Sequence, residues 1–298
     1  MNPKIKGVFA ALASATGYSL VYIFAKLAQR EVETRVFLFW WFFFASLWSL
    51  VLLFSMKRGF SQLIDKIKAH PWFFAYFGFS EAFATFLFFY LVKKMNPSFI
   101  SFIVNLQPLF VIFWGYLIIS EKLNFYEGIG GALAIGGTVI LTYAEPDVTG
   151  VFLLLLFLMV GIYSFNTVLV RMKVRDISPV HIAVFRIYVL FLLYSLFLFS
   201  TGQIKIPSPF ALANILAGSL FGPVLATIFL FVALKYLKAA NVSIIKSVQP
   251  FLVLLLSYWF LHQGLRTSQI MGGVLIIIGI NILIVGNRAG IRRALSEK

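Results

Sequence analysis

The chain of 298 residues contains no cysteine and only three histidines. Without cysteine, the protein forms no disulfide and offers no thiolate ligand to a metal. The histidines, His70, His181 and His262, are far apart, and no carboxylate stands at a metal-ligand spacing from any of them. Neither a zinc site nor a Ser–His–Asp triad is therefore supported. The sequence predicts a protein that is not an enzyme and that uses no metal or cofactor.

The sequence also lacks a phosphate-binding loop and has few charges. The pattern Gly-x-x-x-x-Gly-Lys-Ser/Thr does not occur, which excludes ATP bound in such a loop as a direct energy source. Charged residues make up 12% of the chain, hydrophobic residues make up 61%, and the mean hydropathy is +0.96. A soluble domain has no interior for so much apolar surface. The composition therefore predicts an integral membrane protein.

Uncharged hydrophobic runs recur along the whole chain. A helix of about 20 residues crosses a hydrocarbon core of about 30 Å, and continuously apolar runs favour helices over alternating strands. We expect an all-α polytopic membrane protein with ten transmembrane helices. The expected spans are 7–25, 36–56, 71–92, 98–119, 124–144, 148–170, 179–200, 208–234, 239–260 and 267–286.

The two halves of the chain match one another at a nearly constant separation. The matches at 142 positions are Asn105-Leu-Gln-Pro108 with Ser247-Val-Gln-Pro250, Lys93 with Lys235, and Ser101 with Ser243; those at 145 positions are Tyr18 with Tyr163 and Lys26 with Arg171. We therefore expect two five-helix repeats, residues 1–145 and 146–298. Because five is odd, the second repeat starts on the opposite side of the membrane from the first. Inverted repeats of this kind favour transport by alternating access.

The 25 Lys and Arg residues are unevenly shared between alternate loops. Segments 57–68, 171–175 and 288–298 are rich in them, whereas the loop Glu145-Pro146-Asp147 has none. The positive-inside rule then places both termini in the cytoplasm and that loop outside. The net charge of +15 is thus explained by cytoplasmic loops and does not point to nucleic acid. We expect a monomer or homodimer, surrounded by lipid, in a bacterial inner membrane.

Three charged residues, Glu81, Arg186 and Lys246, fall inside expected spans. Burying each charge costs at least about 2.5 kcal/mol on the mildest insertion scale, so each is a candidate functional residue. The flexible Lys246 stem is able to reach Glu81, whereas Arg186 either extends to cytoplasmic headgroups or contributes to a site. We expect Lys246 to bind substrate and Glu81 to set its charge state or couple a proton. The repeat counterparts of Glu81, Arg186 and Lys246 are Pro223, Trp41 and Val104.

Small polar residues also follow one face of the expected fourth span. Ser98, Ser101, Asn105 and Pro108 have the three- and four-residue spacing of a helix face, and the ninth span has a similar face. Such faces serve either close helix packing or a substrate path. The candidate substrate-binding residues are Lys246, Glu81, Asn105, Ser101, Ser243, Ser247, Gln249, Tyr18 and Arg186.

These patterns resemble the EamA-type members of the drug/metabolite transporter superfamily over about residues 6–286. The motifs that carry the resemblance are Ala233-Leu-Lys-Tyr236, Gln249-Pro250-Phe251 and Gly272-Gly273 with Gly279, and in the first half Tyr90, Gln107-Pro108, Glu121 and Gly130-Gly131. Two positions depart from the family pattern, because Gln263 replaces a Glu that the first half keeps, and Trp41 occupies a position that is often basic. The resemblance implies a ten-helix secondary carrier.

The resemblance implies no single substrate, since relatives carry amino acids, nucleotide sugars, phosphorylated sugars, amines and drugs. Two buried cations against one buried acid suit a carboxylate, so we expect an exporter or exchanger of an amino acid or related small polar metabolite. Protons are the expected coupling ion. The alternatives are an exchanger of phosphorylated or nucleotide-linked sugars and, in another class, a non-transporting membrane receptor or assembly subunit. A wholly apolar centre would favour the last.

Overall fold

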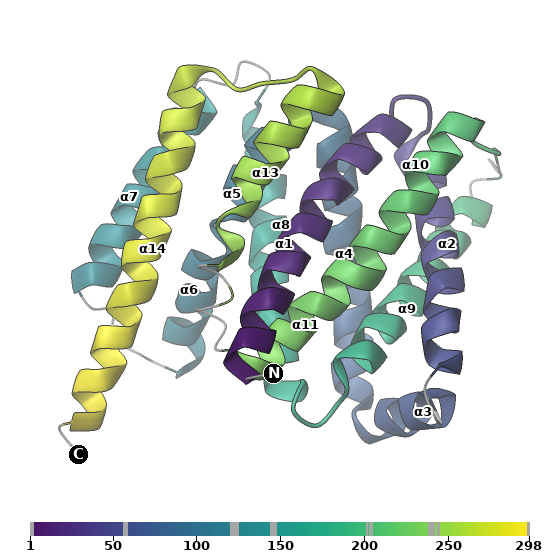
Figure 1. Ribbon diagram of the computed structural model, residues 1–298, viewed down its shortest axis with the longest axis horizontal. Coiled ribbons are helices and arrows are strands. Elements are labelled where there is room, and N and C mark those ends of the chain that lie inside the picture. The colour runs from purple at the N-terminus through teal and green to yellow at the C-terminus, as the bar shows by residue number, and fades with distance from the viewer. Residues whose placement is uncertain are drawn as a thin grey trace.

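The computed structural model describes residues 3–55, 59–119, 125–143, 148–200, 202, 205–237, 242 and 245–296, with side chains except at 112, 115–119, 127 and 283–296. All regular secondary structure in these residues is helical (Figure 1). The elements are α1 (Pro3–Ala28), α2 (Thr34–Phe54), α3 (Gly59–Ala69), α4 (Pro71–Lys94), α5 (Pro97–Val104), α6 (Gln107–Ile119), α7 (Phe125–Tyr143), α8 (Gly150–Lys173), α9 (Pro179–Ser200), α10 (Pro209–Ser219), η1 (Leu220–Ala226), α11 (Thr227–Tyr236), α13 (Gln249–Leu256), η2 (Ser257–Leu261) and α14 (Thr267–Ser296).

Six helical rods within the described residues are long and apolar enough to cross a membrane, namely α1, α2, α4, α8, α9 and α10 continued through η1 and α11. Shorter apolar helical stretches cover 97–111, 128–143, 249–261 and 267–282. The expected all-α, polytopic membrane architecture is therefore confirmed. The long rods and the shorter stretches overlap the expected spans, and six of them are long enough to cross a membrane.

Capping residues explain where several helices begin. Asn96 precedes α5 and its side chain accepts a hydrogen bond from the Ser98 amide at 2.9 Å, with Pro97 as the first helical residue. Ser208 precedes α10 in the same way, and its hydroxyl accepts from the Ala211 amide at 3.2 Å. Proline suits the first turn because its missing N–H would have no partner within the helix there.

The expectation of one continuous helix over 98–119 is wrong, because the chain turns at Asn105 and Leu106 between α5 and α6. Pro108 provides the reason: it has no N–H to donate to the Val104 carbonyl, so the α-helical ladder cannot continue through this point. The single helix face expected from Ser98 to Pro108 is therefore interrupted. Pro223 has a milder effect, since the rod continues there as the wider π-helix η1.

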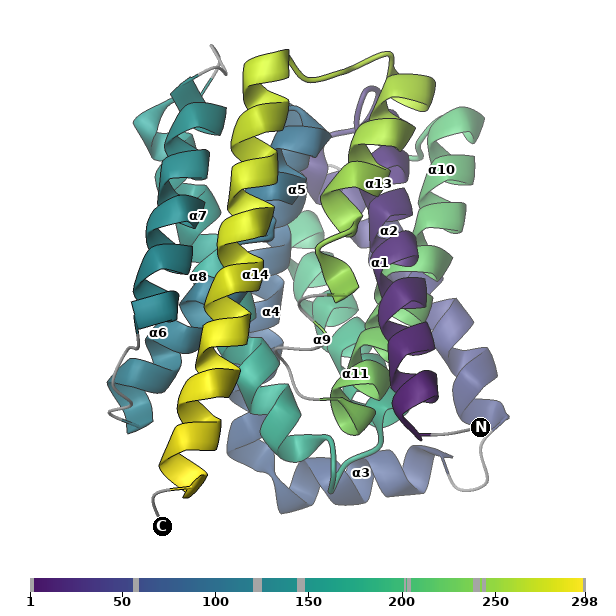
Figure 2. The same ribbon diagram turned by 60° about the vertical axis from the view of Figure 1, so that its left-hand side comes forward.

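The first turn of α1 and the last turn of α14 lie at the same end of the bundle, called here the terminal end (Figures 1 and 2). Helix α3 lies across this end, roughly perpendicular to the long rods (Figure 2). The opposite end is called the far end. Helices α1 and α4 finish at the far end, and α8 and α11 finish at the terminal end.

Helices of the first half pack mainly on helices of the second half. Helix α1 packs on α11 and α13, whereas α8, its counterpart in the second half, packs on α4 and α6. Helices α2 and α9 contact each other, as do α7 and α14, where glycines bring the two backbones together. Thus each half builds its walls with helices of the other half.

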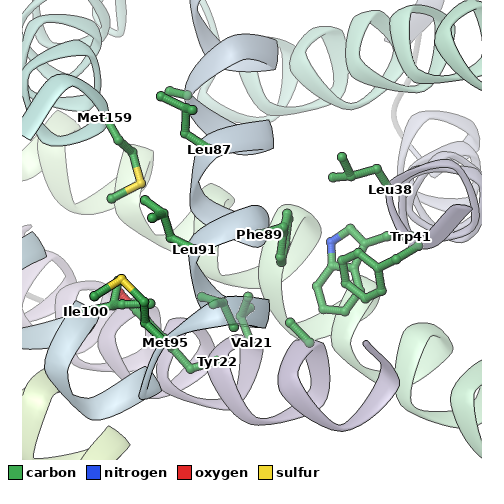
Figure 3. Close-up of a cluster of buried hydrophobic side chains, with 14 of the residues drawn as sticks. Val21, Tyr22, Leu38, Trp41, Leu87, Phe89, Leu91, Met95, Ile100 and Met159 are labelled. Atoms are coloured by element: carbon green, nitrogen blue, oxygen red, sulfur yellow. The ribbon is translucent and has the colours of Figure 1, made fainter. Parts of the chain in front are cut away.

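Buried apolar residues from both halves form one hydrophobic cluster that includes Trp41 of α2, Phe89 of α4, Met159 of α8 and Leu190 of α9. Figure 3 shows Phe89 beside Trp41, whose ring centroids lie 5.2 Å apart. Paired aromatic rings of this kind add to the packing energy of a core. The two halves therefore share a core and fix each other's positions.

Candidate central cavity

A cavity of about 140 Å³ lies at the centre of the bundle. Helices α1, α4, α8 and α11 supply most of its wall, with two residues each from α2 and η1 and one each from α5, α6, α9 and α13. Because one water molecule needs roughly 10–15 Å³ of such space, the cavity has room for several waters or part of a small organic molecule. Its lining combines aromatic and aliphatic side chains with buried polar and charged ones.

A network of charged and polar groups occupies one wall of the cavity. Arg186 of α9 donates through Nε to the Glu81 carboxylate of α4, and its Nη2 donates to Thr85 Oγ1 at 3.0 Å. Asn166 of α8 donates to the other Glu81 oxygen at 2.8 Å and accepts a hydrogen bond from Ser80 at 3.0 Å. Glu81 and Arg186 are only 6% and 8% exposed, so the ion pair is buried.

This network corrects two expectations. Glu81 pairs with Arg186, and no ion pair joins it to Lys246 in the part of the chain that the structure describes. Arg186 does not extend to headgroups, because its guanidinium is held inside the bundle. The two residues meet because α4 packs against α9, and the depth of a residue in its span does not specify that neighbour.

Two tyrosine–threonine hydrogen bonds join helices of different halves. Tyr18 of α1 lies 2.9 Å from Thr227 of α11, hydroxyl to hydroxyl. Tyr163 of α8 donates to Thr85 of α4 at 3.3 Å. Tyr18 matches Tyr163, and Thr85 matches Thr227, at the separations found between the repeats. The same contact is thus made twice, once on each side of the cavity.

Lys246 also lines the cavity, but its surroundings differ from those of Arg186. Its ammonium lies 4.8 Å from the centroid of the Tyr18 ring, a cation–π distance. Among the described residues, no carboxylate forms an ion pair with it. Since Glu81 is already matched by Arg186, Lys246 leaves the cavity with one uncompensated positive charge.

A second cavity of about 40 Å³ adjoins the first, between the turn that joins α5 to α6 and the first residues of α13. Ser101, Asn105 and Pro108 line it from one half, and Gln249 and Pro250 from the other. Asn105 Nδ2 is buried and has no hydrogen-bond partner within the described part of the chain. Lys246 and Gln249 line both cavities, so an anionic group beside Lys246 would have amide donors close by.

The family model described as the EamA-like transporter family matches the chain twice, at residues 5–143 and 150–285. The chain belongs to the EamA-like transporter family. The double match confirms that the protein is a duplicated member of the drug/metabolite transporter superfamily and an integral membrane protein. No curated protein matches.

Solved structures support the fold of this EamA-like protein. One, titled only as the crystal structure of a protein, has a TM-score of 0.66 and 17% sequence identity, and the match covers 93% of this chain and 98% of the other. At this identity the similarity shows the fold alone.

The residues proposed from the EamA-like sequence fall into four groups. Tyr18, Glu81, Arg186, Lys246 and Gln249 line the central cavity, and Ser101 and Asn105 line the smaller one. Ser247 is buried and lines neither of these two cavities. Ser243 lies outside the described residues.

Sequence reasoning missed four polar residues of the cavity wall, Thr85, Thr227, Thr167 and Gln107. A signal for the first two was present, since they match one another at the repeat separation and each is able to bond a repeated tyrosine. By itself this match is a weak signal, because threonine is common in membrane helices, where it serves packing.

Proposed function

We propose that this EamA-like protein is a secondary transporter that moves a small polar metabolite by alternating access, with ten membrane-crossing helical segments in two inverted five-helix repeats. The exchange of packing partners supports the inverted arrangement: α1 packs on α11 and α13 as α8 packs on α4 and α6. Each wall of the cavity therefore contains helices from both repeats. Two such walls tilting against each other would open one end while closing the other.

The transported compound is an amino acid or a related carboxylate, moved by export or exchange. Lys246 carries this proposal, since it is a cavity-lining cation that no carboxylate neutralises among the described residues. A charge-assisted hydrogen bond to a carboxylate would offset part of its desolvation cost. Asn105 and Gln249 would supply amide donors to the same group.

Phosphorylated or nucleotide-linked sugars remain the second candidate, because Arg186 also lines the cavity. Its guanidinium has five N–H donors, and two of them are used in the contacts described above. Against this candidate, Glu81 already neutralises Arg186, which leaves a net charge better matched to one carboxylate than to a phosphate dianion. A non-transporting receptor is less well supported, since the centre of the bundle is not wholly apolar and contains Glu81, Arg186 and Lys246.

Reconstituted liposomes test the proposal. We expect vesicles loaded with unlabelled amino acids to accumulate a radiolabelled amino acid by counterflow, with sugar phosphates as a second panel. The Lys246→Met variant should lose this uptake, whereas Lys235→Met, at an exposed lysine, should retain it. Uptake confined to phosphate esters would select the second candidate. A folded protein that moves neither panel would refute both carrier proposals.

A further inference from the structure

Two basic residues at matched positions cap matched helix ends at opposite ends of the bundle. Lys26, in the last turn of α1, donates three hydrogen bonds to carbonyls at the end of α4, namely those of Val92, Lys93 and Met95, at 2.9–3.0 Å. Arg171, in the last turn of α8, donates to the Leu234 carbonyl near the end of α11.

Both the donor and the acceptor residues of these two contacts are equivalent in the repeat. Lys26 and Arg171 match at the separation of 145 positions, and Val92 and Leu234 match at 142. The last carbonyls of a helix lack intrahelical donors and carry partial negative charge, so a cation is a favourable partner there. One basic residue per repeat therefore makes the same contact, once at each end of the protein.

Both contacts bridge the cavity. Helix α1 packs along α11, and α4 packs along α8, and the Tyr18–Thr227 and Tyr163–Thr85 bonds lie within these two pairs. Lys26 joins α1 to α4, and Arg171 joins α8 to α11, so each links one pair to the other. If the pairs rock against each other, the cap at the opening end has to stretch.

The two ends are not equally closed in this structure. At the far end, the Lys26 cap is joined by Gln29 Nε2 donating to the Phe89 carbonyl at 3.1 Å and by Lys93 Nζ donating to the Val32 carbonyl at 2.9 Å. At the terminal end, a single hydrogen bond joins α8 to α11 within the described residues, namely the bond from Arg171 to the Leu234 carbonyl.

The cavity extends closer to the terminal end than to the far end. Its lining includes Leu234 itself and Val170, the neighbour of Arg171. Toward the far end it stops at Tyr22 and Phe89, about one helical turn before Lys26 and Val92. The cavity thus reaches the Arg171 cap but not the Lys26 cap.

We propose that Lys26 and Arg171 are reciprocal latches: Lys26, with the Gln29 and Lys93 bonds beside it, holds the far end shut in the state seen here, and Arg171, whose bond to Leu234 is already made here, holds the terminal end shut more firmly in the opposite state. The proposal rests on the alternating access proposed above. Removing a latch destabilises the state that it closes, so the two removals shift the conformational equilibrium in opposite directions.

Spin-label distances test the latches without any substrate. The natively cysteine-free chain accepts one cysteine pair at the far end, Arg30→Cys with Lys94→Cys, and one at the terminal end, Met172→Cys with Lys235→Cys. All four side chains are exposed. Each pair carries nitroxides, and the purified protein in nanodiscs is measured by double electron–electron resonance.

The latch proposal predicts opposite changes in the two pairs. Lys26→Met should add longer distances at the far-end pair and narrow the terminal-end distribution toward shorter distances, and Arg171→Met should do the reverse. Lys26→Arg, which keeps a donor cation, should stay close to the wild type. Arg175→Met, at an exposed basic residue of the terminal end, is the matched control and should change neither pair.

Several results would overturn the latches: no change in either pair, lengthening of both pairs in one variant, or the same direction of change in both variants. If Lys26→Met does not fold, Lys26→Gln takes its place, since it removes the charge but keeps an amide donor. Opposite distance shifts in a protein that moves no substrate would support the latches and refute the proposed function. Variants that still transport substrate but show unchanged distances would support the proposed function and refute the latches.

Discussion

Glu81 of α4 and Arg186 of α9 form a buried ion pair on one wall of the central cavity. The repeat places Pro223 and Trp41 at the equivalent positions, and these two also line the cavity. The tyrosine–threonine bonds, in contrast, occur in both halves. The two repeats therefore share a framework but line the cavity differently, because the ion pair of one wall is replaced by Pro223 and Trp41 at the equivalent positions.

The ion pair should be tested by a double-mutant cycle. Removing one partner leaves a buried charge without compensation, which costs on the order of 3–5 kcal/mol. We expect Glu81→Gln and Arg186→Met each to lower the thermal unfolding midpoint in detergent markedly. The double variant should lose less than the sum of the two single losses, because neither charge is then left alone.

Additive losses would contradict a direct ion pair. The same variants also test whether Glu81 couples transport to protons, because counterflow can be measured on those that fold. If Glu81 takes up a proton when a substrate anion competes for Arg186, Glu81→Gln should transport with a weaker dependence on pH than the wild type. Unchanged pH dependence would assign Glu81 a purely structural role.

Lys246 should distinguish anionic from neutral ligands. A hydrogen bond to a charged group contributes about 1.5–3 kcal/mol, so Lys246→Met should weaken binding of a transported carboxylate by roughly tenfold to a hundredfold. The uncharged amide of the same compound should bind both proteins equally. Isothermal titration calorimetry measures both affinities, with Lys235→Met as the control at an exposed lysine. An equal loss for the acid and the amide would mean that Lys246 shapes the cavity without binding the charge.

Neighbouring glycines of α7 offer a matched test of helix packing. A Cβ at Gly137 would lie 2.6 Å from the Gly272 carbonyl oxygen and 2.7 Å from the Ile276 amide nitrogen of α14, whereas one at Gly136 would meet nothing within 4 Å. Gly137→Ala should therefore lower the thermal unfolding midpoint, because two backbones have to separate. Gly136→Ala should leave it unchanged or raise it slightly, since alanine favours the helix. Equal midpoints for the two variants would contradict the close approach of α7 and α14.

Topology is tested by labelling from one side. The distribution of Lys and Arg predicts that Asp65, which is exposed on α3, lies in the cytoplasm and that Asp147 lies outside. In sealed cells, a membrane-impermeant maleimide should react with a cysteine at position 147 but not with one at 65. After permeabilisation both should react. Labelling of both positions in sealed cells would refute cytoplasmic placement of the terminal end.

The sequence alone determined the membrane class, the all-helical character and the duplication. These properties depend on hydropathy and on positional matches along the chain, and they require no knowledge of neighbours. The cost of burying a charge also singled out Glu81, Arg186 and Lys246 before any contact was known. All three line the cavity.

Only the tertiary structure decided which of these charges pair. The sequence gives the depth of Glu81 in its span, but its partner depends on the face that α4 turns toward α9, and that face is set by packing among helices far apart in the chain. Hence Arg186, and not Lys246, neutralises Glu81. The same holds for Lys26, whose position in the repeat was visible in the sequence. The acceptors at the end of α4 became evident only when the two helix ends met in space.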